Sequence, residues 1–169
     1  EGGHRVPFIA SWPGTLPAKS TLPPGMVLVP EGGVQIGDTK VTVGQYLLDR
    51  YEVTNAQYKA FVDQGGYRKR EYWNHPFVKD GKAISWEVAT AMFLDTTGRF
   101  GPSSWEFGTY PEGRADHPVG GVSWYEAAAY AEYAGKALPT VFHWSGTATQ
   151  NLSGNAVPFS NFGSRGLDK

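Results

Sequence analysis

The sequence predicts an α+β domain in which regular secondary structure makes up little of the chain. The 22 glycines and 12 prolines among 169 residues indicate much irregular backbone. The 6 Trp, 9 Tyr and 9 Phe residues indicate large rings that pack across loops, because disordered chains are poor in aromatic residues. Strand patterns come first along the chain and capped helical patterns follow, so we expect a domain that combines strands with helices.

Composition and charge remove several classes of function. The formal net charge of −1 leaves no basic excess to hold a phosphate backbone, so we expect no nucleic-acid partner. The sequence contains no run of about 18 apolar residues, so we expect no membrane-spanning helix. Because the chain has no cysteine, these residues can form no disulfide, zinc thiolate site or cysteine nucleophile.

A proline-rich stretch divides the chain near its start. Residues 15–25, TLPAKSTLPPG, hold 3 prolines and a glycine, which is typical of an extended linker. We therefore expect residues 1–23 to form a leading segment with its linker. Residues 24–169 are then the domain proper.

The first predicted elements of the domain are strands. Residues 26–29 are a short apolar run, residues 31–33 carry a Glu-Gly-Gly turn and residues 34–36 alternate, which together predict a β-hairpin. Residues 46–53 are a third predicted strand. The Asp-Arg step that begins at Asp49 interrupts its apolar run, so we expect these charges to form structural ion pairs with other segments.

Two helices are predicted in the middle of the chain. Thr54 with Gln57 three residues later fits a capping box, and the glycine pair that begins at Gly65 ends the helix. Ser85 is the expected N-cap of a second helix over residues 86–93.

The third predicted helix has the strongest local signals. Ser123 and Glu126 form a second capping box, residues 127–134 are rich in alanine, and Gly135 stands where a C-terminal glycine belongs. A long segment, residues 95–121, separates this helix from the second and is rich in glycine and aromatic residues. Since long irregular loops are uncommon in compact domains, we expect this one to be packed or functional.

Four stretches after the linker carry a family resemblance. They are GMVLVPEGGVQIG, DRYEVTNAQYKAFVDQGGY with Glu-Val-Thr-Asn at residues 52–55, HPVGGVSWYEAAAYAEYAGKALPT, and SNFG at residues 160–163. They resemble the formylglycine-generating enzyme family, also called sulfatase-modifying factors. The intervening segment, residues 73–118, is similar to the subgroup often fused to bacterial protein kinases or other signalling modules. The resemblance covers residues 24–163 and implies an incomplete C-type-lectin-like fold.

The resemblance also implies a chemistry that these residues do not contain. Enzymes of the family oxidise a sulfatase cysteine to formylglycine with molecular oxygen and two active-site cysteines that bind copper. Those cysteines, and the later Gly-Asn-Val-Trp-Glu-Trp and Arg-Gly-Gly-Ser-Trp segments, do not occur in this sequence. Because soft thiolates are what select Cu(I), we expect no copper here. Many relatives that lack the cysteines act as binding domains or catalyse other reactions.

The opening stretch, EGGHRVPFIASWPG, resembles a different family. It is similar to the Glu-Gly-Gly-x-Arg-Val-Pro-x-Ile-x-x-Trp-Pro-Gly segment of type I sulfatases. The Cys-x-Pro-Ser-Arg nucleophile motif and the calcium-binding carboxylates of those enzymes are absent. A sulfatase interpretation therefore covers about the first 20 residues and brings no catalytic residue with it.

Calcium is the one metal for which the resemblance implies ligands that this sequence contains. Asn161 and Phe162 fall where the family places a side-chain oxygen and a carbonyl oxygen on calcium, which makes half of a ligand set. The alternative is an asparagine in a turn. The four histidines lack the short spacing of a ligand cluster, so we interpret them as hydrogen-bonded loop residues rather than metal ligands: His4, His75, His117 and His143.

Carboxylates and aromatic rings are the remaining candidate groups. Glu52 and Glu126 are interpreted as structural, since the capping box already explains Glu126. A peptide groove would be lined by large rings, and packing of irregular loops explains the same rings equally well. The rings concerned are Trp73, Trp86, Trp105 and Tyr110.

Three hypotheses follow for function. The first is a non-catalytic module that binds a polypeptide or has a structural role. The second is a fragment of a formylglycine-generating oxidase, and the third is a sulfatase remnant. If the fold needs further strands to cover its edges, the chain is also expected to be marginally stable or to self-associate.

Overall fold

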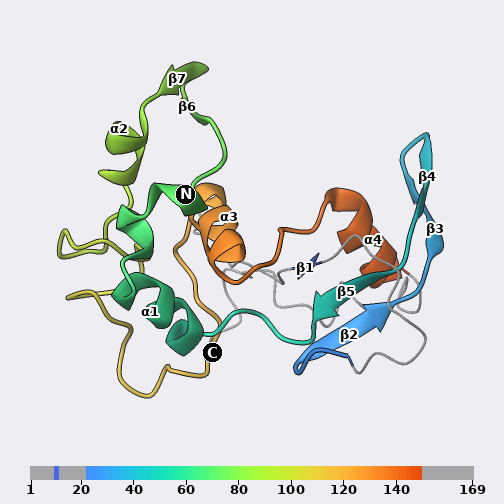
Figure 1. Ribbon diagram of the computed structural model, residues 1–169, viewed down its shortest axis with the longest axis horizontal. Coiled ribbons are helices and arrows are strands. Elements are labelled where there is room, and N and C mark those ends of the chain that lie inside the picture. Colours follow the sequence, from blue (N-terminus) through green and yellow to red (C-terminus); the bar gives the residue numbers. More distant parts are fainter. Residues whose placement is uncertain (1–9, 12–21, 150–169) are drawn as a thin grey trace, which may run out of the picture.

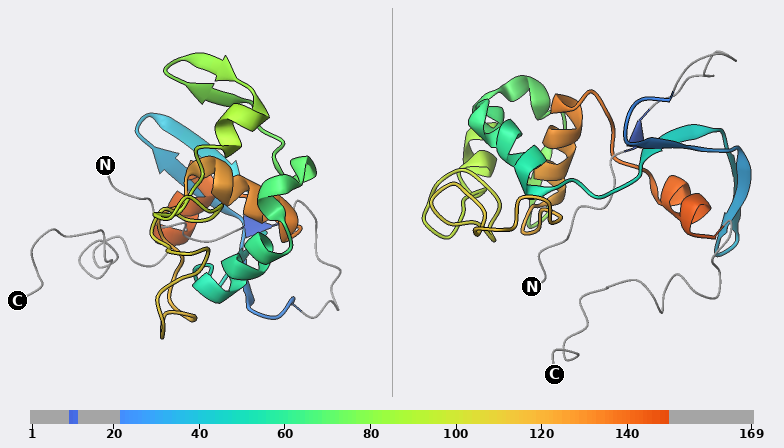
Figure 2. Two further views of the ribbon diagram at one scale, coloured as in Figure 1. Left: turned by 90° about the vertical axis from the view of Figure 1, so that its left-hand side faces the viewer. Right: turned by 90° about the horizontal axis from the view of Figure 1, so that it is seen from below.

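A computed structural model of the chain describes residues 10–11 and 22–149. Asn161 and Phe162, His4 and most of the sulfatase-like opening stretch lie outside the described residues. The described elements form two lobes that lie side by side (Figures 1 and 2). We call residues 10–11, 22–49 and 141–149 the strand-rich lobe, and residues 53–134 the helical lobe.

The strand-rich lobe combines a three-stranded antiparallel sheet, a two-stranded ribbon and one helix. The sheet has the order β1-β5-β2, the ribbon pairs β3 with β4, and helix α4 packs mainly against β3. Its core consists of the buried side chains of Val29, Val34, Val43, Tyr46 and Leu48. The elements are β1 (Ala10–Ser11), β2 (Met26–Val29), β3 (Gly32–Ile36), β4 (Thr39–Val43), β5 (Tyr46–Asp49) and α4 (Val141–Thr149).

The predicted hairpin between residues 26–29 and 34–36 is wrong. Strand β2 pairs with β5, with Val27 opposite Leu48, and β3 pairs with β4. Pro30 follows β2 directly and has no N–H to donate to a ladder. The tight turn of the true hairpin lies between Ile36 and Thr39, where Gly37 has a φ of 56°.

The third predicted strand is shorter than expected because the chain changes lobes within it. β5 ends at Asp49, and Val53 is already buried in the core of the helical lobe. Helix α4 is absent from the prediction, since Gly146 signals a loop in the sequence. In the structure Gly146 lets α4 approach β3 closely, because a Cβ there would lie 3.1 Å from Cγ2 of Val34.

The helical lobe begins with α1 and ends with α3, the two helices for which the sequence predicts a capping box. Thr54 and Ser123 form complete capping boxes, and Gly135, with a φ of 66°, follows α3. Lys136 N–H donates to the carbonyl of Ala131 at 2.9 Å, which closes α3 with a Schellman motif. The elements are α1 (Asn55–Asp63), the 3-10 turns η1 (Gly66–Arg68) and η2 (Arg70–Tyr72), β6 (Phe77–Lys79), β7 (Lys82–Ile84), α2 (Trp86–Thr90) and α3 (Trp124–Tyr133).

Helix α2 stops three residues before the predicted end. Ser85 caps it as expected, but Phe93 leaves the helix and stacks on Trp73 with a centroid distance of 5.4 Å. The β6–β7 ribbon is missing from the prediction, although its turn is an Asp-Gly pair. Asp80 and Gly81 have φ values of 50° and 74°, as a type I′ turn requires.

Aromatic rings make up most of the helical lobe's core, as the composition predicts. Tyr58 stacks on Tyr130 at 5.2 Å and meets Trp105 edge to face at 6.1 Å. Phe61 is fully buried among further rings, and Gly66 packs so closely on it that an added Cβ would overlap its ring. Large rings therefore hold irregular segments together where regular elements are few.

The two lobes meet at a narrow neck where the chain passes twice. It leaves the strand-rich lobe after β5 and returns after α3. Lys136 Nζ lies 2.6 Å from Asp49 Oδ1 across this neck, and Arg50 N–H donates to the carbonyl of Gly25 at 2.8 Å. The expected structural ion pair of Asp49 is thereby confirmed, with Lys136 as its partner.

Candidate functional site: an apolar groove on the helical lobe

An open groove of about 700 Å³ lies on the surface of the helical lobe. It lies between the β6–β7 ribbon, α2 and the N-terminal end of α3. Its lining is mostly apolar, and two large side chains at its rim are exposed, Val78 at 51% and Met92 at 44%. The groove's apolar lining includes Phe77, Ile84, Ala89, Phe93, Val122 and Tyr125.

Contacts between α3 and β6 fix the walls of this groove. The Phe77 ring packs against the Tyr125 ring at 4.8 Å, and Tyr125 comes from the first turn of α3. The Tyr125 hydroxyl accepts a hydrogen bond from Val78 N–H at 2.9 Å. Tyr125 therefore contacts both the buried ring of Phe77 and the backbone of β6 at Val78, which gives the groove a defined shape.

The one buried acid of the groove, Glu126, is engaged in structural contacts. Its side chain belongs to a residue that is only 3% exposed. It accepts hydrogen bonds from the Tyr67 hydroxyl at 2.6 Å and from Ser123 N–H at 2.7 Å. Burial raises the pKa of Glu126, and the hydrogen bonds from Tyr67 and Ser123 oppose this rise. This confirms the interpretation of Glu126 as a cap.

A second, more polar hollow of about 490 Å³ lies at the neck. Its lining includes Glu52, Asp116 and the exposed ring of Tyr51. The Asp49–Lys136 ion pair also lines it, so that these two charges neutralise each other. Glu52, which the sequence analysis interprets as structural, lies at the wall of this hollow.

The aromatic candidates from the sequence lie in different surroundings. Trp105 is 1% exposed, and Trp73 is buried with its indole N–H donating to the Gly66 carbonyl at 3.0 Å. Packing therefore accounts for both rings. Tyr110 is partly buried against Trp105 at 5.5 Å. Trp86 is partly buried at a hollow of about 220 Å³, and its buried indole N–H has no hydrogen-bond partner in the described part of the chain.

A buried amide in the Glu-Val-Thr-Asn segment organises the long loop after α2. Asn55 Nδ2 donates to the carbonyls of Arg114 at 2.9 Å and His117 at 3.2 Å. Its Oδ1 accepts the indole N–H of Trp105 at 2.9 Å. The loop is therefore packed and held from α1, which is one of the two alternatives expected for it.

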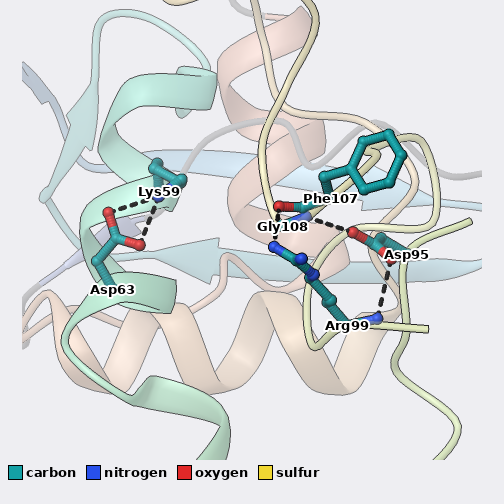
Figure 3. A network of polar contacts seen from close by, with 6 residues as sticks. All are labelled: Lys59, Asp63, Asp95, Arg99, Phe107 and Gly108. Atoms are coloured by element: carbon teal, nitrogen blue, oxygen red, sulfur yellow. Dashed lines mark hydrogen bonds and ion pairs between the residues drawn. The ribbon is translucent and has the colours of Figure 1, made fainter. Parts of the chain in front are cut away.

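A second buried group, Asp95, shapes the tip of the same loop (Figure 3). Its carboxylate accepts backbone N–H groups of Thr97, Arg99 and Gly108 at 2.6–3.0 Å. Burial raises the pKa of Asp95, but these hydrogen bonds outweigh it and lower the pKa to about 2. Phe107, with a φ of 54° and 65% exposed, is thereby presented at the surface, and Arg99 Nη1 donates to its carbonyl at 2.8 Å.

The three described histidines, His75, His117 and His143, make unrelated contacts. The His75 ring meets Trp124 edge to face at 4.7 Å, and the His117 carbonyl accepts the N–H of Asn55 at 2.9 Å. His143 Nδ1 lies 2.6 Å from the Thr140 hydroxyl. Among residues 10–11 and 22–149, no three His, Cys, Asp or Glu side chains are grouped to hold a metal.

The sequence holds no cysteine, so these residues cannot build the thiolate site that the family resemblance implies.

No helix within the described ranges has the length and apolar character needed to cross a bilayer.

The chain belongs to the family of sulfatase-modifying factor enzyme 1-like domains, whose model matches residues 13–167. This confirms the resemblance drawn from the sequence motifs. The formylglycine-generating enzyme of Bos taurus is 31% identical over 188 aligned residues, which cover 94% of this chain and 48% of that protein. The formylglycine-generating enzyme of Thermomonospora curvata is 31% identical over 159 residues, 81% of this chain and 52% of that protein.

A relative with a different name matches a shorter stretch. The hercynine oxygenase of Mycolicibacterium thermoresistibile is 34% identical over 106 residues, 62% of this chain and 22% of that protein. The chain thus spans about half the length of the two formylglycine-generating enzymes, and less of this oxygenase.

Sequence reasoning missed the residues that form the groove. No sequence motif marks Val78, Lys79 or Met92. These residues line one groove with Tyr125 only in the folded chain. The Asp-Gly pair that begins at Asp80 is the one local signal that would have revealed the ribbon.

Proposed function

We propose that this chain is a polypeptide-binding module of the sulfatase-modifying-factor type, built on an incomplete lectin-like fold, with the apolar groove as its binding surface. The observation that carries the proposal is an open, mostly apolar groove with exposed Val78 and Met92 at its rim. Exposed apolar patches of this kind mark interaction sites on folded proteins. The groove's size is within the range of ligand-binding clefts.

Two features favour binding over chemistry within these residues. The buried acid of the groove, Glu126, accepts hydrogen bonds from the Tyr67 hydroxyl and from the Ser123 N–H that caps α3. Its carboxylate is therefore not placed to act as an acid or base toward a ligand. Most of the residues that line the groove have apolar side chains. A groove that is open to solvent suits an extended chain, which can lie along it and insert single apolar side chains.

The names of the relatives support a second candidate function. Proteins similar to this chain are named formylglycine-generating enzyme and hercynine oxygenase. On this alternative, the chain is part of an oxidising enzyme, and the groove holds a cysteine-containing polypeptide for chemistry that residues outside this sequence perform. A calcium ion held in part by Asn161 and Phe162 remains a proposal under both functions.

Binding is tested with fluorescein-labelled extended peptides by fluorescence anisotropy. In a random-sequence pool, we expect selection of peptides with two or more large apolar residues. Val78→Glu and Met92→Glu place a charge on the apolar rim and should weaken binding at least about tenfold. Val88→Glu is the matched control, because Val88 is 53% exposed on α2 and does not line the groove. Equal effects of Val78→Glu and Val88→Glu would refute the groove as the site.

The same preparation separates binding from catalysis. A cysteine-containing sulfatase peptide is incubated with the chain, oxygen and copper, and is then analysed by mass spectrometry. We expect the cysteine to remain unchanged. Formation of formylglycine by this chain alone would overturn the non-catalytic proposal and favour the oxidase.

A further inference from the structure

We infer that the groove selects acidic polypeptides, in which an apolar side chain fills the groove and a nearby carboxylate meets a lysine pair at its mouth. This inference rests on the proposed polypeptide-binding function and specifies the chemistry of the partner. It is carried by the inventory of charges around the groove and by the register of the β6–β7 ribbon.

Within the described part of the chain, the groove's lining has one charge that a ligand can reach. Of the described residues that line it, only Lys79 and Glu126 are charged. The Glu126 carboxylate is buried and hydrogen-bonded by Tyr67 and Ser123, and it complements the N-terminal end of α3. Lys79 is exposed, and its Nζ lies 3.4 Å from the Met92 sulfur at the apolar rim. The accessible charge at the mouth is therefore positive.

The ribbon places a second lysine beside the first. Lys79 and Lys82 are directly opposite partners across the Asp80–Gly81 turn. Side chains that are directly opposite in an antiparallel pair lie on the same face, and like charges in such a pair destabilise it. Neither lysine forms an ion pair with any described residue, although Asp80 lies in the turn between them. The pair is thus a repulsive arrangement that a bound carboxylate would relieve.

These observations together define the partner. The apolar lining requires at least one large apolar side chain, and the lysine pair favours a carboxylate close to it. Charge complementarity of this kind sets specificity and association rate more than total affinity. Neither Glu87 on α2 nor Lys82 lines the groove, and Lys82 adds to the positive charge at the mouth through its position opposite Lys79. An acidic segment of a second protein fits both requirements, and a basic segment meets the lysines with like charge.

The test uses three fluorescein-labelled peptides that share their apolar residues and differ at one flanking position. That position carries Glu, Gln or Lys. For the unmodified chain, we expect the Glu peptide to bind about fivefold more tightly than the Gln peptide, as befits an accessible ion pair. The Lys peptide should bind more weakly than both. The preference for Glu should shrink as the salt concentration is raised from about 50 to about 500 mM, because salt screens exposed charges.

Charge variants test whether Lys79 on the β6–β7 ribbon causes the preference for the Glu peptide. Lys79→Glu should reverse the order, so that the Lys peptide binds more tightly than the Glu peptide. Lys40→Glu is the matched control, since Lys40 is an exposed lysine on β4, in the ribbon of the other lobe. It should leave the order unchanged. Circular dichroism and a thermal melt of each variant establish that it is folded.

The possible failures are distinct. Equal binding of the Glu and Gln peptides, with Val78→Glu still disrupting both, would overturn the acidic partner and leave the polypeptide-binding groove standing. Equal effects of Lys79→Glu and Lys40→Glu would overturn the placement at the ribbon. Absence of peptide binding at chain concentrations where sedimentation shows a monomer would overturn both proposals.

Discussion

Asn55→Ala is expected to destabilise the helical lobe strongly, although it removes only a small side chain. The amide is buried and bonds to three groups across the long loop: the carbonyls of Arg114 and His117, and the indole N–H of Trp105. Both carbonyls keep another donor, since His117 N–H reaches Arg114 and Asn55 N–H reaches His117. The group left without a partner is therefore the buried indole N–H.

The expected magnitude follows from that orphaned donor. A buried polar group without a hydrogen bond costs about 1–3 kcal/mol, and the small void left by the amide adds roughly 1 kcal/mol. We expect Asn55→Ala to lower the free energy of unfolding by about 2–4 kcal/mol in urea titrations followed by far-UV circular dichroism. For a domain of this size, the corresponding fall in Tm is roughly 10 °C.

Two further variants make the reasoning refutable. Asn74→Ala is the matched control, because Asn74 is exposed, and it should change stability by less than about 0.5 kcal/mol. In the background of Trp105→Phe, which removes the indole N–H, Asn55→Ala should cost about 1–2 kcal/mol less than in the unmodified chain. If Asn55→Ala matches the Asn74 control, or if the double variant shows no coupling, Asn55 does not hold the loop as described.

Three other predictions concern stability. Gly66→Ala should cost about 2–3 kcal/mol in urea titrations because its Cβ would overlap a buried ring, whereas Gly65→Ala should cost only about 1 kcal/mol for its positive φ; equal costs would contradict the packing. Asp95→Asn should lose about 2 kcal/mol at pH 7. The pKa of Asp95 falls from 3.8 to about 2 on folding. The stability that the ionised Asp95 carboxylate contributes is therefore present above about pH 4 and is lost as the pH falls toward 2. If Tm falls between pH 4 and pH 2 just as much in Asp95→Asn as in the unmodified chain, this account of Asp95 is wrong. Lys136→Met should cost about 1–2 kcal/mol and Lys59→Met less than about 0.5 kcal/mol, since only the first lysine's ion pair is partly buried at the neck.

The elements that sequence predicted well depend on residues close together in the chain. Thr54 and Ser123 begin helices because their hydroxyls and the side chains three residues later satisfy each other's backbone groups. Gly135 ends α3 for an equally local reason, since its positive φ needs no distant partner. These caps act within one or two turns, so the sequence displays them directly.

Strand pairing and the groove depend on contacts that sequence does not display. The apolar run of β2 is compatible with several partners, and its true partner, β5, lies beyond the β3–β4 ribbon. Gly146 carries the composition of a loop, and only the distance to Val34 explains it within a helix. The groove joins β6 to α3 through Tyr125, across 47 positions of sequence. No local period or motif spans such a separation.

The double passage of the chain through the neck has a consequence for synthesis. The buried core of the helical lobe, from Val53 to Ala131, comes from one continuous segment, whereas the strand-rich lobe needs α4 to cover Val34 and Tyr46. As the chain leaves the ribosome, the helical lobe is complete while the strand-rich lobe still lacks helix α4. The strands made first are therefore the last to be buried, and they must remain unaggregated until residues 141–149 emerge. Exposure to chaperones is expected to be longest for this N-terminal apolar segment.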